Sequence, residues 1–328
     1  MTVYIRYDNQ SLQDGLGAQA LRIMGVYSIA RTFRLRYLHA EIQSTVEEFS
    51  HSHDTQSNQT TLDKFNDFFR FPSFVAPIFF SKTYNFRSLT RKQLLQIMFH
   101  YSFTKKNVLI IVLLPFAITD KYPFIFRHAS EVLRKRELNM LELNDVSKIQ
   151  PLVAHIRFGY GWMYGEQSHV KKRQFLSPRY FTEVINSACS LFSIPNSLPL
   201  LIHTDLSKFD TIWKPQSRET IEGFRLISGD PNAETLLIKG RNLSDEIDIP
   251  QEYSLDVRYC ADTYEAFLDM CRARVLIMGT STFSYLAGLI NSNIVVWPSI
   301  HGHSKLPGWY SELDLGINVS DAHIEHVV

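Results

Sequence analysis

The second half of the chain alternates between short apolar segments and helical segments, and this order restricts the fold more than any other feature. The apolar segments are 152–157, 198–204, 223–228, 274–279 and 293–298, and the helical segments among them are 177–192, 262–273 and 281–291. Short apolar runs are typical of strands buried on both faces of a parallel sheet. Parallel strands need crossover connections, which the helical segments supply. The sequence therefore predicts a doubly wound α/β domain.

Two of these helical segments carry start signals. Ser177 precedes Pro178, which suits a capping residue followed by proline in the first turn. Asp262 is the first residue of the segment 262–273, where its carboxylate can cap the helix by accepting hydrogen bonds from free backbone N–H groups. We expect helices to begin at both places.

The first half of the chain opens with the same kind of unit. Residues 3–7 read as a strand, 8–17 as a polar turn containing glycines, and 36–40 as the next strand. Between them, apolar residues recur every three or four positions from Leu16 to Ala30, the stripe of an amphipathic helix. This order of strand, glycine turn, helix and strand predicts a first α/β domain.

The rest of the first half is less regular. We expect an exposed loop over 44–62, irregular helices over the phenylalanine-rich 63–103, a buried strand at 107–114 and a linking helix at 129–138. A chain of 328 residues with 45% hydrophobic content can bury two cores. The expected domains are residues 1–149 and 150–328.

Composition excludes some classes of partner. The formal charge of +1, from 34 basic and 33 acidic side chains, gives no field that gathers nucleic acid. The most apolar run, 107–119, is interrupted by Pro115 and is shorter than the ~20 residues that span a membrane. The start of the sequence lacks a secretory signal pattern, and three widely spaced cysteines suit a reducing compartment. We expect a cytoplasmic protein with no nucleic-acid partner and no integral membrane segment.

Polar residues follow three strands of the second domain. They are His155 and Arg157 after the first, His203, Thr204 and Asp205 after the second, and Gly279, Thr280, Ser281, Thr282 and Ser284 after the fourth. Ligands of parallel α/β sheets bind beyond the carboxyl ends of the strands. A helix start with hydroxyl groups is a ready anion site, and an arginine beside it can bind phosphate oxygens in a fork. Together these residues predict a diphosphate pocket that needs no metal.

Each part of this pattern also has a plainer interpretation. A strand ending in His-x-Arg is often part of a surface ion pair, and a Thr-Ser-Thr run is often only a helix cap. The two features occur together where the topology expects a ligand, and this favours the anion site.

Several of these segments, taken in order, resemble a known family. DGLGAQALRIMGVYSIARTF, from Asp14, resembles the Gly-Leu-Gly-Asn-Gln motif and helix of the α-1,2-fucosyltransferases. VAHIRFGYG, from Val153, is similar to their His-x-Arg-Arg-Gly-Asp motif, which α-1,6- and protein O-fucosyltransferases share in variant form. LSPRYFTEVI resembles the family segment after that motif, and LIHTD resembles its Phe-Ser-Asp-Asp strand end. The stretch from Asp262 to Asn291 is similar to the family segment that ends in Ser-Thr-Phe-Ser-Trp-Trp-Ala-Ala-Trp-Leu-Asn.

The resemblance implies a GT-B fold, in which two Rossmann-like domains face each other across a cleft, with the donor bound mainly by the C-terminal domain. It implies an inverting transfer of fucose from GDP-fucose to a glycan acceptor, without a metal or other cofactor. Carried over by position, Arg157 and His155 match the residues at the donor diphosphate, and Asp205 the acid near the nucleotide. The hydroxyl run near the phosphates is matched by Ser281, Thr282 and Ser284. The glycine loop that faces the donor is matched by Gly15 and Gly17.

The sequence departs from the family pattern at several positions. Phe158 stands where the second arginine is found, and Tyr160 where the motif has aspartate. Ala18 replaces the asparagine of the glycine motif, while Tyr285 and Leu286 replace two tryptophans. Two alternatives therefore stay open: the same fold with another nucleotide sugar as donor, and a catalytically silent protein that binds a sugar nucleotide or glycan.

An inverting transfer also needs a general base for the acceptor hydroxyl. Glu166 is the carboxylate of the loop that follows Arg157, and the α-1,6-fucosyltransferases have a glutamate at nearly this offset. The competing interpretation makes Glu166 a solvated residue paired with Lys171 or Lys172. Asp14, in the glycine loop of the first domain, is the second candidate for the base.

Overall fold

In a computed structural model the chain divides into two compact units. The structure describes residues 2–10, 15–43, 55–140, 151–157, 174–197, 199–205, 211–213, 236–238, 242–259 and 261–326. Unit 1 comprises residues 1–46, 54–145 and 302–308, and unit 2 comprises residues 47–53, 146–301 and 309–328. The short return of the chain to unit 1 is fastened there by His303, whose Nδ1 lies 3.1 Å from Asp120 Oδ1.

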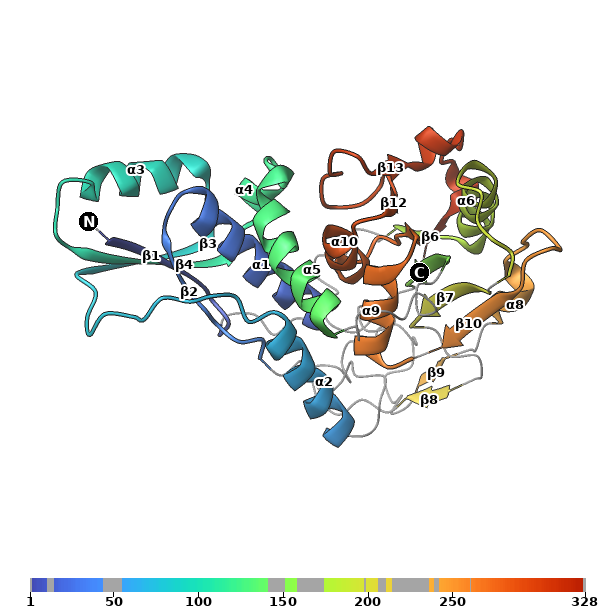
Figure 1. Ribbon diagram of the computed structural model, residues 1–328, viewed down its shortest axis with the longest axis horizontal. Helices are drawn as coiled ribbons and strands as arrows, with labels where there is room; N and C mark the ends of the chain where they lie inside the picture. Colours follow the sequence, from blue (N-terminus) through green and yellow to red (C-terminus); the bar gives the residue numbers. More distant parts are fainter. Residues whose placement is uncertain are drawn as a thin grey trace. The chain divides into compact units, whose positions relative to one another are not determined.

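Unit 1 is built on a four-stranded parallel sheet with the strand order β2-β1-β4-β3 (Figure 1). Its strands are β1 (Thr2–Tyr7), β2 (Arg36–Leu38), β3 (Lys82–Ser88) and β4 (Asn107–Leu114). Its helices are α1 (Leu16–Thr32), α2 (Thr55–Phe68), α3 (Arg91–Tyr101), α4 (Phe116–Thr119) and α5 (Arg127–Met140), with a 3₁₀ turn at Pro123–Phe126. The strands expected at 3–7, 36–40 and 107–114 and the helix at 129–138 are confirmed.

Three expectations for unit 1 are wrong in detail. The loop expected at 44–62 gives way to α2 from Thr55, and the segment expected to be only helical contains the strand β3. β3 escapes sequence patterning because it is an edge strand with mostly exposed side chains. The helix α1 exists, but it is not amphipathic: every residue from 19 to 30 is buried, because α1 contacts the sheet as well as α2, α4 and α5.

Unit 2 is built on a six-stranded sheet with the order β10-β7-β5-β11-β12-β13, in which every neighbouring pair is parallel. Its strands are β5 (Leu152–Ile156), β7 (Leu200–Thr204), β10 (Leu255–Tyr259), β11 (Val275–Ile277), β12 (Ile294–Trp297) and β13 (Tyr310–Ser311). Its main helices are α6 (Pro178–Leu191), α8 (Leu243–Glu246), α9 (Thr263–Arg272) and α10 (Thr282–Ile290). Two antiparallel pairs join β6 (Gln174–Leu176) to β14 (Ile324–His326) and β8 (Thr211–Trp213) to β9 (Leu236–Ile238), and 3₁₀ turns lie at Glu312–Leu315 and Asp321–His323.

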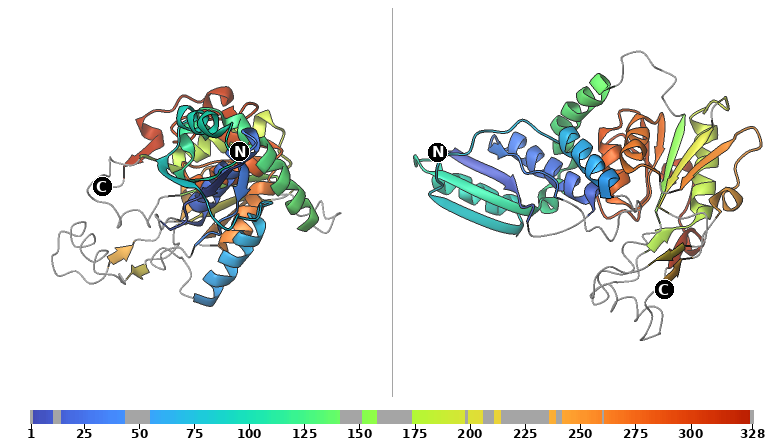
Figure 2. Two further views of the ribbon diagram at one scale, coloured as in Figure 1. Left: turned by 90° about the vertical axis from the view of Figure 1, so that its left-hand side faces the viewer. Right: turned by 90° about the horizontal axis from the view of Figure 1, so that it is seen from below.

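Helices cover both faces of the unit 2 sheet, α6 on one face and α9 and α10 on the other (Figure 2). The alternation of side chains along β5 explains this: Leu152, Ala154 and Ile156 pack into the apolar core formed with α6. The expected caps are confirmed, since Ser177 Oγ accepts from Tyr180 N and the Asp262 carboxylate accepts from the N–H groups of residues 264 and 265. The predicted α/β class with parallel sheets is therefore confirmed.

Sequence patterning missed β10, whose residues are all only half-buried. The strand expected at 223–228 lies outside the described residues. Among the helices described, none combines the length and the apolar character that crossing a membrane requires.

Candidate functional site

The candidate site lies where the connections of the unit 2 sheet change direction. From β5 the chain moves outward to β7 and β10, and it then returns to the other side of β5 to form β11, β12 and β13. The switch point therefore falls between β5 and β11. In open parallel sheets, the crevice beyond the carboxyl ends of the two strands at this point is the usual place for a ligand.

The predicted site residues Arg157, Asp205 and Ser281 come together at this switch point. Arg157 follows β5, and its Nη1 donates a hydrogen bond to Ser281 Oγ at 3.3 Å. Its Nε lies 3.4 Å from Asp205 Oδ2, at the end of the neighbouring strand β7. The Arg157 side chain keeps 32% of its surface exposed, so the guanidinium is held in place and still reaches solvent. The sheet thus presents an oriented cation.

Ser281 also caps the helix that follows β11. Its Oγ accepts from Phe283 N at 3.1 Å, and this orients the first turn of α10 toward the same edge of the sheet as Arg157. The buried His301 also contacts this turn, with Nε2 lying 3.4 Å from the Ser281 carbonyl oxygen. The free N–H groups of a helix start carry partial positive charge. Arg157 and the α10 start together therefore form a cradle suited to an anion.

The other two hydroxyl residues of this turn differ in their positions. Thr282 is half-buried at the first position of α10. Ser284 is fully buried, and its Oγ donates to Ser281 O at 3.1 Å and Gly279 O at 3.4 Å. The Ser284 hydroxyl hydrogen is thus used to hold the turn. Thr282 is the more accessible of the two.

Gly279 allows β11 to approach β5 closely at the site. A Cβ atom at this position would lie 2.6 Å from the His155 carbonyl oxygen, which is backbone and cannot move aside. Glycine is therefore required for the spacing that brings Ser281 within reach of Arg157. The sequence offered Gly279 only as a strand-end glycine, with no sign of this contact.

His155 lies beneath the cradle as a neutral imidazole. It is 6% exposed, and its ring packs 5.7 Å from that of Phe283. Burial, together with electrostatic interactions with Arg157 and His203, lowers the pKa of His155 to about 3. Within the described residues its Nδ1 has no hydrogen-bond partner. His155 therefore contributes shape and a neutral ring to the site, not positive charge.

A second polar group at this edge was not predicted from the sequence. Asp269, on α9, accepts from His203 Nε2 at 3.0 Å and from Arg258 Nη1 at 3.1 Å. This network ties the end of β7 to β10 and to α9, and so positions the neighbouring Asp205. The signal that could have revealed it is an aspartate on a helix expected to pack against the sheet, because a largely buried carboxylate needs a partner.

The remaining predicted site residues lie in unit 1 or outside the described residues. Gly15 and Gly17 lie at the start of α1 in unit 1, where Gly15 is the N-cap residue and a Cβ on it would meet no atom within 4 Å. Nothing in the described packing requires glycine at position 15. Asp14 and Glu166, the two candidates for the general base, lie outside the described residues. Among the residues described, no three His, Cys, Asp or Glu side chains are grouped so that they could hold a metal ion.

Comparison with known proteins identifies no family. No family model matches the chain, and no curated protein matches it. Among solved structures, the α-1,6-fucosyltransferase NodZ soaked with GDP-fucose aligns with 88% of this chain and 92% of its own, at 11% identity and a TM-score of 0.31. NodZ structures of this kind include one from Bradyrhizobium. The E. coli heptosyltransferase WaaC with ADP aligns with 95% of this chain and 92% of its own, at 9% identity and a TM-score of 0.28. TM-scores this low establish neither a shared fold nor a shared activity.

Proposed function

We propose that this protein is a glycosyltransferase that moves a sugar from a nucleoside diphosphate donor, GDP-fucose in the first instance, to a hydroxyl group of a glycan. The observation that carries the proposal is the position of Arg157. Arg157 lies at the switch point of a parallel sheet and donates a hydrogen bond to Ser281 at the start of a helix. A diphosphate fits such a cradle because both the guanidinium and the helix start favour negative charge.

The same groups can lower the barrier to transfer. As the bond between the anomeric carbon and the diphosphate oxygen breaks, negative charge grows on the leaving diphosphate. Arg157 and the N–H groups at the start of α10 stabilise this charge as it develops, at no cost of reorganisation, because Asp205 and Ser281 already hold the guanidinium. His155 stays neutral, so the positive charge that faces the anion comes from Arg157 and the start of α10.

The remaining assignments follow from the sequence resemblance. We assign donor binding to residues 150–328 and the acceptor side to residues 1–149, as two Rossmann-like domains facing across a GT-B cleft. Gly15 and Gly17 then belong to the loop that faces the donor. Glu166 is our first candidate for the general base of an inverting, metal-independent transfer, and Asp14 is the second. The cytoplasm is the proposed compartment.

The donor is tested by binding and the cradle by substitution. Thermal-shift measurements with GDP, UDP and their sugars identify the base, because a ligand that binds the folded state raises the melting temperature. Arg157→Ala is then compared with Arg179→Ala, which removes a 64% exposed arginine from a surface pair with Glu183 on α6. We expect Arg157→Ala to lose about a hundredfold in transfer rate, roughly 3 kcal/mol of transition-state stabilisation, and Arg179→Ala to lose none.

Two results would contradict the proposal. Equal melting temperatures with and without every nucleotide sugar would remove the donor site. Near-native turnover of Arg157→Ala with a verified acceptor would remove this cradle from the mechanism. If UDP and not GDP raised the melting temperature, the reaction class would stand and a UDP-linked sugar would be the donor in place of GDP-fucose.

A further inference from the structure

One segment of unit 1 differs in charge from the rest of the protein. Between Asp67 and Asp120 the chain contains seven Arg and Lys residues and no Asp or Glu. Because the whole chain has a net charge of only +1, the remaining residues carry six more acidic than basic groups. The near-neutral composition therefore conceals a strongly basic segment, which covers β3, α3 and β4.

The same segment exposes unusually many large apolar side chains. Of the eleven large hydrophobic residues that are strongly exposed in the described part of the chain, seven lie between positions 74 and 103. Ile78 is 103% exposed, Phe79 71%, Phe99 76% and Phe103 91%. Soluble proteins expose single apolar residues freely, but a concentration of them marks a contact surface.

Four of these residues lie at one edge of the sheet. β3 and β4 are parallel, with Lys82 opposite Val108, and Ser81 N donates to Asn107 O at 2.8 Å. The residues just before β3 and those just before β4 are therefore neighbours at the amino end of the sheet. Ile78 and Phe79 come from the first segment and Phe103 from the second, while Phe99 lies one helical turn earlier, at the end of α3.

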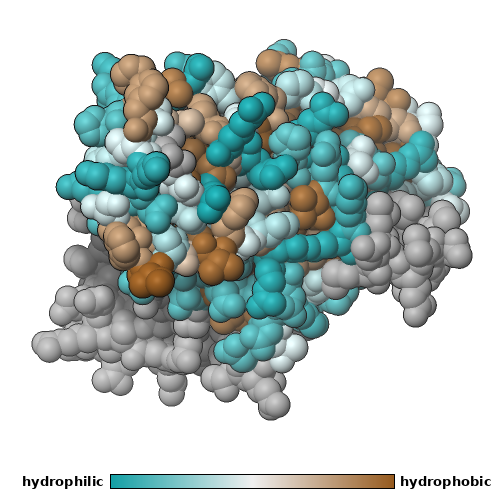
Figure 3. Space-filling view, turned by 60° about the vertical axis from the view of Figure 1, so that its left-hand side comes forward, coloured by the Kyte–Doolittle hydropathy of each residue, from teal (hydrophilic) through white to brown (hydrophobic). Residues whose placement is uncertain are grey.

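Lysines surround these apolar residues. Lys82, Lys105 and Lys106 are all exposed, at the first position of β3 and just before β4. Together with Ile78, Phe79, Phe99 and Phe103 they form what we call the amino-edge surface. On the face of the molecule that Figure 3 brings forward, apolar side chains are interleaved with hydrophilic ones.

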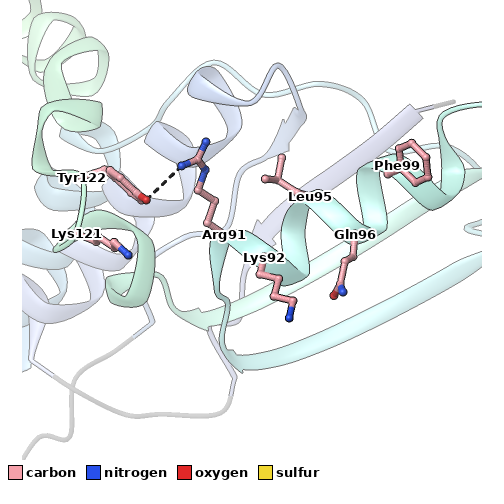
Figure 4. Close-up of a pocket in the computed structure, with 7 residues that line it drawn as sticks. All are labelled: Arg91, Lys92, Leu95, Gln96, Phe99, Lys121 and Tyr122. Carbon is pink, nitrogen blue, oxygen red and sulfur yellow. Dashed lines mark hydrogen bonds between the residues drawn. The ribbon is translucent and has the colours of Figure 1, made fainter.

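A cationic groove continues this surface along α3. The groove has a volume of about 570 Å³, and Phe99 lies at one end of it (Figure 4). Its other end is formed by Arg91, whose Nη1 donates to the Tyr122 hydroxyl at 3.2 Å, together with Lys92 and Lys121. The groove thus joins the exposed aromatic ring of Phe99 to three further cations without an intervening carboxylate among its lining residues.

We propose that the amino-edge surface docks unit 1 onto the surface of a bilayer containing anionic lipids. Aromatic rings and long aliphatic side chains favour the interfacial layer of a membrane, and lysines beside them are attracted by anionic headgroups. The complete lack of acidic residues in the segment gives the charge complementarity that this partner requires. The carboxyl ends of the same strands lie at the opposite edge of the unit 1 sheet, where they stay clear of the lipid.

The test is sedimentation of the full-length protein with phosphatidylcholine vesicles, with and without phosphatidylglycerol. We expect binding that requires the anionic lipid and weakens as salt is added. Lys105→Ala/Lys106→Ala should lower the partition coefficient about 25-fold, because each lysine near an anionic surface contributes about fivefold. Phe99→Ser/Phe103→Ser should lower it as well, since apolar insertion is lost.

Matched controls remove exposed groups of the same kind elsewhere. Arg127→Ala/Lys135→Ala takes two exposed cations from α5, and Leu191→Ser/Leu313→Ser takes two exposed apolar side chains from unit 2. Both should bind vesicles like the unchanged protein, and all variants should keep its circular dichroism spectrum. The proposal is overturned if the unchanged protein ignores anionic vesicles, or if the controls lose binding as strongly as the surface variants. It is equally overturned if the surface instead proves to mediate dimerisation or binding to a single-stranded oligonucleotide.

Discussion

Acidification should destabilise unit 2 through His155. The pKa of this imidazole is lowered to about 3, chiefly by its burial beneath the Arg157 cradle and further by the charge of Arg157. In the unfolded chain a histidine titrates near pH 6.5. Because the folded pKa lies below the unfolded one, the unfolded state binds a proton first as the pH falls. The stability associated with neutral His155 is therefore fully present above pH 6.5 and is lost between about pH 6.5 and pH 3.

The size of the effect follows from the two pKa values. Lowering the pH from about 7.5 to 5 should cost roughly 2 kcal/mol of unfolding free energy through this group alone, with a limit of roughly 5 kcal/mol that is reached below pH 3. Other groups titrate over the same range, so the absolute slope does not isolate His155. The difference between the unchanged protein and His155→Gln does, because glutamine is neutral throughout.

Tryptophan fluorescence makes the measurement specific to one unit. All four tryptophans, at positions 162, 213, 297 and 309, belong to unit 2. Urea unfolding followed by their emission at a series of pH values gives the free energy of unfolding of that unit. We expect the advantage of the unchanged protein over His155→Gln to shrink by roughly 2 kcal/mol from pH 7.5 to 5. A constant difference, or an NMR titration of His155 with a midpoint near pH 6.5, would refute the reasoning.

Three further substitutions test the site. Gly279→Ala should cost about 1–3 kcal/mol of unit 2 stability in urea unfolding, because its Cβ would lie 2.6 Å from the His155 carbonyl oxygen. Gly302→Ala, in unit 1 and with no atom within 4 Å of its Cβ, should leave both units nearly unchanged when unfolding is followed by circular dichroism. Asp269→Asn removes the carboxylate charge shared by His203 and Arg258, and we expect a loss of about 1–3 kcal/mol of unit 2 stability in urea unfolding together with weaker nucleotide binding by calorimetry. Glu166→Gln should lower kcat by about 10²- to 10⁴-fold with donor affinity little changed; an unaltered kcat would transfer the role of base to Asp14.

Much of unit 2 could be predicted from the sequence because its local signals and its tertiary structure agree. The apolar strands are buried on both faces, so their composition alone distinguishes them, and Ser177 and Asp262 cap the helices that follow. The polar residues after β5, β7 and β11 were recognisable as a site because parallel strands end at one common edge. Arg157, Asp205 and Ser281 do meet there.

What the sequence could not decide depends on contacts between residues distant in the chain. β3 and β10 carry no continuous buried pattern, since an edge strand gains its partner only when the sheet assembles. α1 has the spacing of an amphipathic helix, yet it is buried on all sides because later elements close over it.

The finer points of the site have the same origin. Nothing near Asp269 in the sequence announces His203 and Arg258, and nothing near Gly279 announces the His155 carbonyl. The sequence by itself determined the strands that are buried on both faces and the chemical groups that stand at their ends, because burial and capping are local requirements. Only the tertiary structure decided which of those groups touch, because the strand order that places β11 beside β5 is set by the packing of the whole sheet.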